Sequence, residues 1–218
     1  EEFLRAQLRT SARARFGEKP LPAVRLQLQQ LDRRLRTFAR IQAGEARGGW
    51  RIAHAELKLE GAFLDVDGVA IEIKGRVDRI DRHADGRWRI LDYKTGDDAC
   101  DPKGAHLTRN GWRDLQLPLY RHFLRERLPG AIELGYFALT RKLDDCGVYL
   151  ARLEEAELDG AIDEARRIVR EMLAGDFARV LRGQPSDRVQ RALCGLSLLA
   201  LESAGAADHD DPAGEEAE

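Results

Sequence analysis

Apolar and polar residues alternate in two neighbouring stretches of the chain, 69–81 and 87–95, and a short polar segment with a glycine, 82–86, separates them. Alternation with a period of two indicates β-strands that bury one face, and a glycine-containing turn is typical of the connection between antiparallel strands. We therefore predict a β-hairpin across 69–95. The same pattern predicts three further strands, at 50–60, 132–139 and 147–150.

Helical spacing of apolar residues occurs on both sides of these strands. It predicts helices at 3–16, ending at Gly17, and at 24–44, and three more that begin near Asp114, at Asp159 and at Phe177. The polar segment 97–111, with Lys103, His106 and Arg109, is expected to be a loop beside the hairpin that can touch a phosphate backbone. Together these elements favour an α/β fold, with a central mixed β-sheet flanked by α-helices.

Two carboxylates and one ammonium group of the hairpin are expected to lie close together. Because side chains alternate along a strand, Asp92 and Lys94 share one face, and Asp78 on the paired strand lies within reach of them. Two neighbouring carboxylates repel each other unless a cation such as Mg²⁺, which prefers oxygen ligands, binds both. Lys94 can then orient an attacking water and offset charge that develops on a phosphate. The three residues predict phosphodiester hydrolysis, whereas Asp92 and Lys94 alone would be typical of a solvated ion pair.

Other residues can complete such a site. The backbone carbonyl of Tyr93 and the side chain of Glu56, on a predicted strand, are candidate further metal ligands, with His54 as a weaker candidate than Glu56. Gln116 and Tyr120 are four residues apart on one predicted helix, so both side chains can point toward the metal.

The composition of the 218 residues, 43% hydrophobic and 34% charged, indicates a globular protein, and no apolar run approaches the length of a membrane span. The net charge of −2 includes the segment 203–218, which has six acids and no Lys or Arg and is expected to be disordered. The remaining residues carry 36 basic and 32 acidic side chains, so an anionic ligand is not excluded. Within the predicted helix 24–44, four arginines can contact nucleic acid or simply face solvent: Arg33, Arg34, Arg36 and Arg40.

The three cysteines, Cys100, Cys146 and Cys194, are scattered along the chain and include no Cys-x-x-Cys pair. This pattern favours a reducing, cytoplasmic setting over a disulfide scaffold or a zinc site. The chain begins with Glu-Glu-Phe, inside a predicted helix and without a methionine. We therefore expect it to be part of a longer polypeptide.

Three sequence blocks resemble, in order and spacing, the PD-(D/E)XK nuclease domain of the RecB and AddB type: Gly75-Arg-Val-Asp78-Arg, Asp92-Tyr-Lys94-Thr-Gly and Gln116-Leu-Pro-Leu-Tyr120. The resemblance covers roughly residues 52–139 and implies a restriction-endonuclease-like core. It implies that Asp78 and Asp92 are catalytic metal ligands and that Lys94 is the catalytic lysine. Residues that help to position DNA would be Gln116, Tyr120 and Arg76.

The resemblance also implies a Mg²⁺-dependent deoxyribonuclease, in which Mn²⁺ can substitute, acting in DNA recombination and repair. Its partners would be DNA and a helicase domain or subunit, with no membrane. Relatives usually carry an upstream Gly-x-x-x-His metal element, which no segment before Trp50 matches, and we expect that element to lie outside these residues. No iron–sulfur cluster is expected, because Cys194 has no closely spaced cysteines beside it.

The predicted nuclease domain spans 1–202, with N-terminal helices at 1–46, a catalytic core at about 50–150 and C-terminal helices at 154–202, followed by the acidic tail 203–218. Two other functional classes stay open. A phosphoryl-transfer enzyme could use Asp92 as an aspartyl nucleophile, although that chemistry needs neither Asp78 nor Gln116. A DNA-binding domain could also retain the nuclease fold without catalysis.

Overall fold

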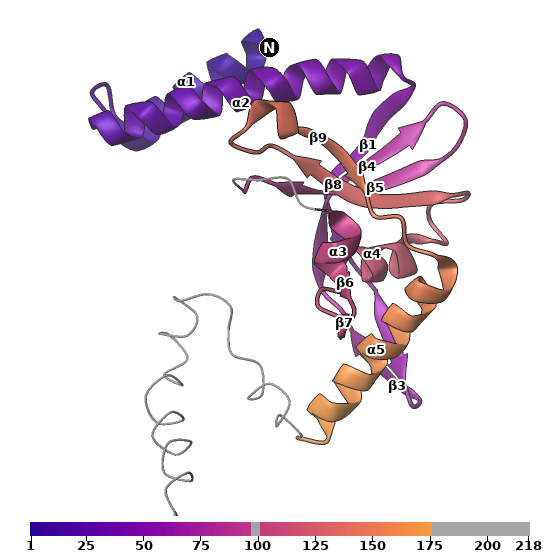
Figure 1. Cartoon of the computed structure of the whole chain (residues 1–218). Helices are drawn as coiled ribbons and strands as arrows, with labels where there is room; N and C mark the ends of the chain where they lie inside the picture. The colour runs from indigo at the N-terminus through magenta and orange to yellow at the C-terminus, as the bar shows by residue number, and fades with distance from the viewer. Residues whose placement is uncertain (97–100, 176–218) are drawn as a thin grey trace, which may run out of the picture. The chain divides into compact units, whose positions relative to one another are not determined.

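One mixed sheet of five strands, in the order β1-β4-β5-β8-β9, organises the protein. In a computed structural model, which describes residues 1–96 and 101–175, this sheet belongs to a unit that spans Glu1–Arg170 (Figure 1). Strands β5 and β8 are parallel, and the other neighbouring pairs are antiparallel. The strands are β1 Trp50–Leu59, β4 Gly75–His83, β5 Trp88–Lys94, β8 Ile132–Ala138 and β9 Gly147–Leu150. The predicted mixed sheet is therefore confirmed.

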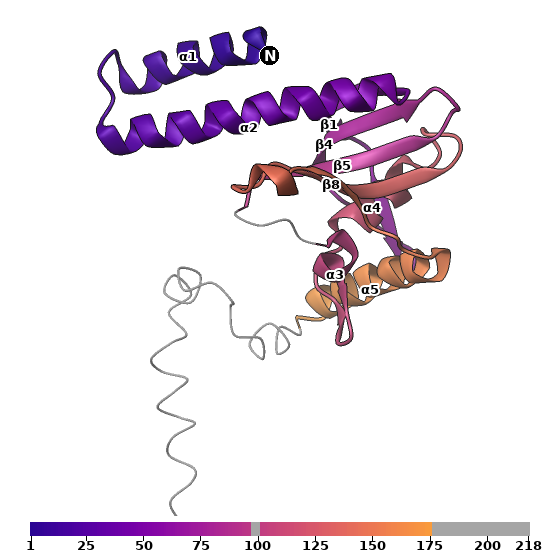
Figure 2. The ribbon, with the colours of Figure 1, turned by 45° about the horizontal axis from the view of Figure 1, so that its top comes forward.

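Helices cover both faces of this sheet, as predicted (Figures 1 and 2). On one face lies α2, whose Phe38 ring packs 5.1 Å from the ring of Phe137 on β8. On the other face α4 buries Leu117 and Leu124 in the main hydrophobic core. The helical elements are α1 Glu2–Phe16, α2 Pro22–Arg47, α3 Pro102–His106, α4 Gln116–Leu124, the short 3₁₀ helix η1 Leu143–Asp145 and α5 Glu155–Leu173.

The prediction of one strand across 69–81 is wrong. The chain instead forms β3 Val69–Glu72, which pairs with β2 Phe63–Val66 in a separate hairpin, and then β4. Asp67 and Gly68 have φ values of 54° and 83°, as the tight turn of a two-residue hairpin requires. An Asp-Gly pair between alternating segments is a sequence signal for this turn, and it could have revealed the hairpin. The buried side of β2 packs against α5.

Three smaller predictions are also corrected. Residues 101–112 form no loop but α3 and a hairpin of β6 Leu107–Thr108 and β7 Gly111–Trp112. Asp159 does not begin a helix, since α5 starts four residues earlier. Asp114 does accept a hydrogen bond from the Gln116 amide at 2.8 Å, but the N-cap position itself is Leu115.

The predicted helix after Phe177, the tail 203–218, Cys100, Cys194 and residues 97–100 lie outside the described residues. Among the described helices, none combines the length and apolar character that crossing a membrane would require.

Candidate active site

The register of the β4–β5 hairpin brings the two predicted carboxylates together. The antiparallel pairs run from Arg82↔Trp88 to Arg79↔Leu91, so Asp78 stands opposite Asp92, one position beyond the last pair. Directly opposite residues of antiparallel strands project to the same face of the sheet. The register, extended by one position, thus places Asp78 and Asp92 on one face, as the sequence pattern predicts.

The Asp78 side chain makes a hydrogen bond just beyond the last backbone pair of β4 and β5. Its Oδ2 accepts a hydrogen bond of 2.9 Å from the backbone amide of Tyr93. In an extended strand the N–H and C=O of one residue point to the same side, so the Tyr93 carbonyl faces the side on which Asp78 lies. The Asp78 side chain thus replaces a ladder hydrogen bond and holds its carboxylate beside the end of β5.

Lys94 completes the cluster at the end of β5. Its Nζ lies 2.7 Å from Oδ2 of Asp92 and 4.7 Å from the ring centroid of Tyr136, which the parallel register aligns with Asp92 on β8. The Lys94 side chain is 38% exposed, whereas that of Asp92 is 9% exposed. The ammonium group is therefore held by a largely buried carboxylate and an aromatic face, and it is still open to solvent.

The first turn of α4 ties Asp92 to β4. Gln116 donates from Nε2 to Oδ1 of Asp92 at 3.1 Å and to the hydroxyl of Tyr120 at 3.1 Å. The Tyr120 hydroxyl in turn donates to the Arg76 carbonyl at 2.7 Å. A Cβ at Gly75 would lie 3.3 Å from Cε1 of Tyr120, a tight contact that would require the ring to shift by a few tenths of an ångström. Sequence spacing correctly placed Gln116 and Tyr120 on the side of the helix that faces the carboxylates.

The side chains of four candidate residues do not point into the cluster of Asp78, Asp92 and Lys94 as a substrate or metal contact would: Arg76, Glu56, Tyr120 and His54. The Arg76 and Glu56 side chains are 55% and 63% exposed and pair with each other at 3.4 Å. The Tyr120 ring is only 8% exposed, so Tyr120 can help to position DNA through its neighbours and not by direct contact. His54 is exposed on β1.

The oxygen atoms of this cluster suit a hard divalent cation. Mg²⁺ commonly binds through one or two carboxylates and keeps several waters. One oxygen of Asp78 makes no hydrogen bond or ion pair within residues 1–96 and 101–175, and the Tyr93 carbonyl lies on the same side. Over the same residues, no three His, Cys, Asp or Glu side chains gather as a group that could hold a metal, so Glu56 does not join the two aspartates in one. Two carboxylates and a carbonyl remain as the candidate donors.

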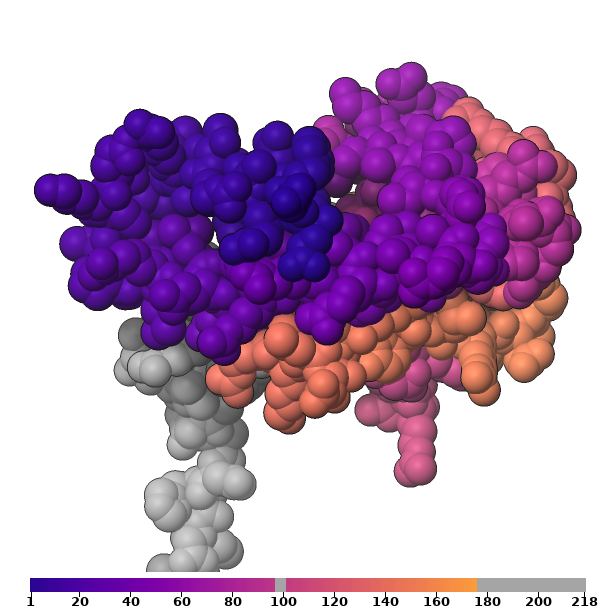
Figure 3. Space-filling view, turned by 90° about the horizontal axis from the view of Figure 1, so that it is seen from above, coloured from indigo at the N-terminus to yellow at the C-terminus, as the bar shows by residue number. Residues whose placement is uncertain are grey.

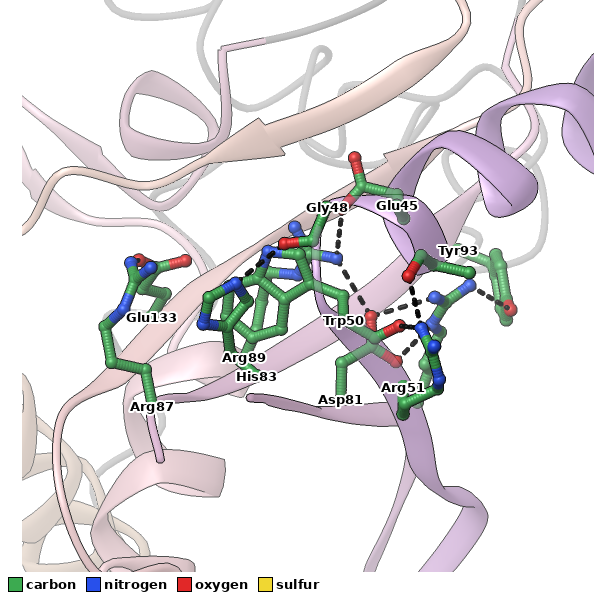
Figure 4. A network of polar contacts seen from close by, with 12 residues as sticks. Glu45, Gly48, Trp50, Arg51, Asp81, His83, Arg87, Arg89, Tyr93 and Glu133 are labelled. Atoms are coloured by element: carbon green, nitrogen blue, oxygen red, sulfur yellow. Dashed lines mark hydrogen bonds and ion pairs between the residues drawn. The ribbon is translucent and has the colours of Figure 1, made fainter. Parts of the chain in front are cut away.

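The opposite face of the hairpin holds a buried ion network that the sequence analysis missed (Figure 4). Arg79 donates two hydrogen bonds to Asp81, of 2.7 and 2.8 Å, and Arg89 bridges Asp81 at 3.0 Å and Glu45 of α2 at 2.6 Å. Burial opposes the charge of Arg79, but hydrogen bonds with Asp81 and Tyr93 outweigh it, so the Arg79 pKa is raised. Alternation alone could not distinguish these residues from a polar solvent-facing row.

Arg79 also connects this network to the candidate site. Its Nη1 donates to the Tyr93 hydroxyl at 3.4 Å, and the Tyr93 amide donates to Asp78. Arg79, on one face of the sheet, thus holds the Tyr93 side chain, and Asp78, on the other face, holds the Tyr93 backbone. The buried network supports the strand end at which the two aspartates and Lys94 meet.

The segment expected to be a phosphate-binding loop is anchored instead of open. His106 is fully buried, with Nδ1 2.8 Å from the Asp114 carbonyl and Nε2 2.8 Å from the Tyr136 hydroxyl. Since the carbonyl can only accept, Nδ1 carries a proton and donates it to this bond. Lys103 pairs with Glu157 at 2.6 Å. Of the three basic residues in this predicted loop, only Arg109 is exposed.

A family of known proteins matches almost the whole chain. The model of the PD-(D/E)XK nuclease superfamily matches residues 1–194. Two solved structures are similar. A candidate exonuclease from Eubacterium rectale has a TM-score of 0.47 and 14% identity, with 80% of this chain and 66% of that chain covered. The protein SSO0001 has a TM-score of 0.39 and 18% identity, with 91% and 77% covered.

The chain thus spans just under two thirds of the length of the first of these structures. A search of curated proteins found no match. The family match does not depend on those two likenesses, because it covers well over half of the chain and includes Asp78, Asp92, Lys94 and Gln116. On this ground the chain belongs to the PD-(D/E)XK nuclease superfamily.

Proposed function

We propose that this protein is a Mg²⁺-dependent deoxyribonuclease that hydrolyses phosphodiester bonds at the end of β5. The observation that carries the proposal is the convergence of Asp78, Asp92 and Lys94 on one sheet face, with Lys94 Nζ 2.7 Å from Asp92. Nucleases of this superfamily generally use divalent metal ions. Mg²⁺, or Mn²⁺ in its place, is the ion that the oxygen donors described above favour.

The residues divide the work by charge. Asp78, Asp92 and the Tyr93 carbonyl would hold the cation, which when bound supplies positive charge to the phosphate and acidifies a water. Lys94 is partly exposed and cannot bind the metal, so its ammonium group would orient the attacking water and neutralise charge on the phosphate in the transition state. Gln116 keeps Asp92 in place through its hydrogen bond to Oδ1.

The resemblance to the RecB and AddB type extends this proposal. It suggests a nuclease part of a helicase–nuclease that processes DNA ends in recombination and repair, within the cytoplasm. The motif blocks around Asp78, Asp92 and Gln116 support this assignment. A helicase domain or subunit would then be the partner, and an upstream histidine would complete the metal shell.

Metal binding tests the site directly. Replacing Asp78 or Asp92 with asparagine should lower the affinity for Mn²⁺ and Mg²⁺ in calorimetric titration, and DNA cleavage should fall with it, because each change removes one negative charge. The control is Asp85→Asn, since Asp85 is an exposed aspartate in the turn of the same hairpin and pairs with Arg87 at 2.9 Å. Metal affinity equal to that of the wild type in both Asp78→Asn and Asp92→Asn would contradict the metal site. A wild type that binds metal and DNA without cleaving DNA would instead favour the non-catalytic alternative.

Tyr120 is expected to act through its neighbours. Tyr120→Phe removes the hydroxyl that links Gln116 to the Arg76 carbonyl, and this should cost about 1 kcal/mol of stability and slow DNA cleavage severalfold. The control is Tyr149→Phe, which loses a 2.9 Å hydrogen bond to the Asp145 carbonyl, away from the carboxylates. Both variants should unfold at lower urea concentration, but only Tyr120→Phe should change the cleavage rate per folded molecule. Equal cleavage rates in the two variants would contradict the role of Tyr120.

A further inference from the structure

The positive charge of this chain is concentrated in its first two helices. Residues 1–47 contain eleven Lys and Arg against five Asp and Glu, whereas the remaining residues contain 25 basic and 33 acidic side chains. The helical part that precedes the sheet therefore has a net charge of +6, and the rest has −8. An asymmetry of this size points to a polyanionic ligand at the basic end.

Helix α2 gathers most of its arginines on one side. At 3.6 residues per turn, the five arginines of this set fall within roughly 80° of one another around the helix axis. They are Arg25, Arg33, Arg36, Arg40 and Arg47, and we call them the arginine stripe. Phe38 and Glu45 lie on the other side of α2, where they contact Phe137 and Arg89 of the sheet. The arginine stripe therefore faces away from the sheet. Figure 3 shows the first two helices, in indigo and violet, on the side of the molecule toward the viewer.

Four members of the stripe have no hydrogen-bond or ion-pair partner among residues 1–96 and 101–175. Arg25, Arg33, Arg40 and Arg47 are exposed, and none forms a side-chain hydrogen bond or ion pair with any residue in the described part of the chain. Arg36 alone is paired, with Asp32 at 2.8 Å. Exposed arginines at this spacing repel one another, and a bound polyanion would relieve that repulsion.

A groove between α1 and α2 continues the stripe. It encloses about 490 Å³ and is lined by Arg5, Arg9, Arg33 and Arg36 but by only one acid, Asp32. A hydrogen bond from Arg5 holds the pKa of Asp32 below its usual value, so this carboxylate stays ionised. Even so, the guanidinium groups around the groove outnumber it.

The shape and chemistry of the stripe fit a nucleic-acid backbone better than an acidic protein. From Arg25 to Arg47 it extends for about 33 Å at 1.5 Å per residue, close to the length of one duplex turn. Within the arc of its arginines lie Gln29 and Ala43, neither of them a large apolar side chain, while Asp32 borders the arc on one edge and the exposed Leu26 on the other. Protein interfaces usually need an apolar or aromatic anchor, whereas phosphate contacts do not.

We propose that the arginine stripe and the adjoining groove bind the phosphate backbone of DNA at a distance from the scissile bond. The inference deepens the proposed nuclease function and rests on it for the choice of DNA as the polyanion. On the side opposite the stripe, Arg34 donates to the Thr95 carbonyl at 3.2 Å, next to Lys94. The same helix thus carries the stripe and contacts the strand end of the candidate site.

Salt dependence of DNA binding provides the test. The full chain would be titrated with a fluorescent 30-base-pair duplex in EDTA between 50 and 200 mM KCl, so that binding is measured without cleavage. Replacing Arg25, Arg33, Arg40 and Arg47 together with glutamine should weaken binding about tenfold or more at 100 mM KCl. It should also reduce the slope of log K against log salt by about 3 to 4, since each phosphate contact contributes about 0.9.

The control removes equal charge elsewhere. Four exposed arginines outside α1 and α2 would be changed to glutamine: Arg82, Arg125, Arg127 and Arg152. This control should keep the wild-type slope, and the stripe variant should retain its circular-dichroism spectrum. An unchanged slope in the stripe variant, an equal loss in the control, or tighter binding of a poly-glutamate peptide than of DNA to the stripe would each overturn the proposal.

Hydrolysis of a small phosphate ester distinguishes failure of the proposed nuclease function from failure of the proposed DNA-binding surface. Bis(p-nitrophenyl) phosphate is too small to reach the stripe, so both variants should hydrolyse it at the wild-type rate with Mn²⁺. Absence of hydrolysis of both this ester and DNA by the wild type would count against the nuclease function. A reduced salt slope in the stripe variant would still support the stripe as a DNA-binding surface in that case.

Discussion

Replacing Lys94 with alanine is expected to reduce DNA cleavage by roughly 10²- to 10³-fold or more, while metal and DNA binding stay close to those of the wild type. The reason is a division of labour at the end of β5. Asp78 and Asp92 supply the negative charge that retains a cation, whereas Lys94 is positive and cannot bind one. Loss of its ammonium group should therefore slow the chemical step and leave binding unchanged. Single-turnover cleavage of labelled DNA with Mg²⁺ would measure the rate of that step.

A matched lysine on the same sheet provides the control. Lys58 is an exposed residue of β1, so Lys58→Ala removes the same charge without touching the carboxylates. Calorimetry with Mn²⁺ would confirm that Lys94→Ala still binds metal. The wild type must first be shown to cleave DNA under the same conditions, because an incomplete metal site would inactivate every variant equally. Cleavage by Lys94→Ala as fast as by the wild type would show that the assigned role of Lys94 is wrong.

Replacing Asp81 with alanine should produce the largest loss of stability, about 3–5 kcal/mol in the free energy of unfolding. Asp81 is fully buried between Arg79 and Arg89, whose guanidinium groups are also almost completely buried. Without the carboxylate, two desolvated positive charges would lie close together, and among the described residues only Glu45, which pairs with Arg89, would remain to balance them. Urea unfolding followed by circular dichroism would measure the effect.

Two comparisons make this prediction specific. Asp85→Ala removes an aspartate paired with Arg87 on the exposed turn of the same hairpin and should cost little, since solvent screens that pair. Replacing Arg79, Asp81 and Arg89 together with apolar residues of similar volume should restore much of the stability lost in Asp81→Ala, because no uncompensated charge would then remain buried. A loss in Asp81→Ala no greater than in Asp85→Ala would contradict the buried network.

The candidate site could be predicted from sequence because its geometry is local. A period of two places Asp92 and Lys94 on one strand face, and the turn before Trp88 sets the register that brings Asp78 opposite Asp92. Helical spacing likewise aligned Gln116 with Tyr120. None of these relations requires knowledge of what covers the sheet.

The remaining features depend on contacts between distant parts of the chain. Arg79 and Asp81 alternate like solvent-facing residues, and only the packing of α2, which brings Glu45 to Arg89 across 44 positions, buries them. The hairpin of β2 and β3 is itself local, and the Asp-Gly pair predicts its turn, but its packing on α5, far along the sequence, could not be predicted from alternation. Alternation determines which residues share a face, whereas the element that covers that face, and so the cost of burying its charges, is decided by tertiary packing.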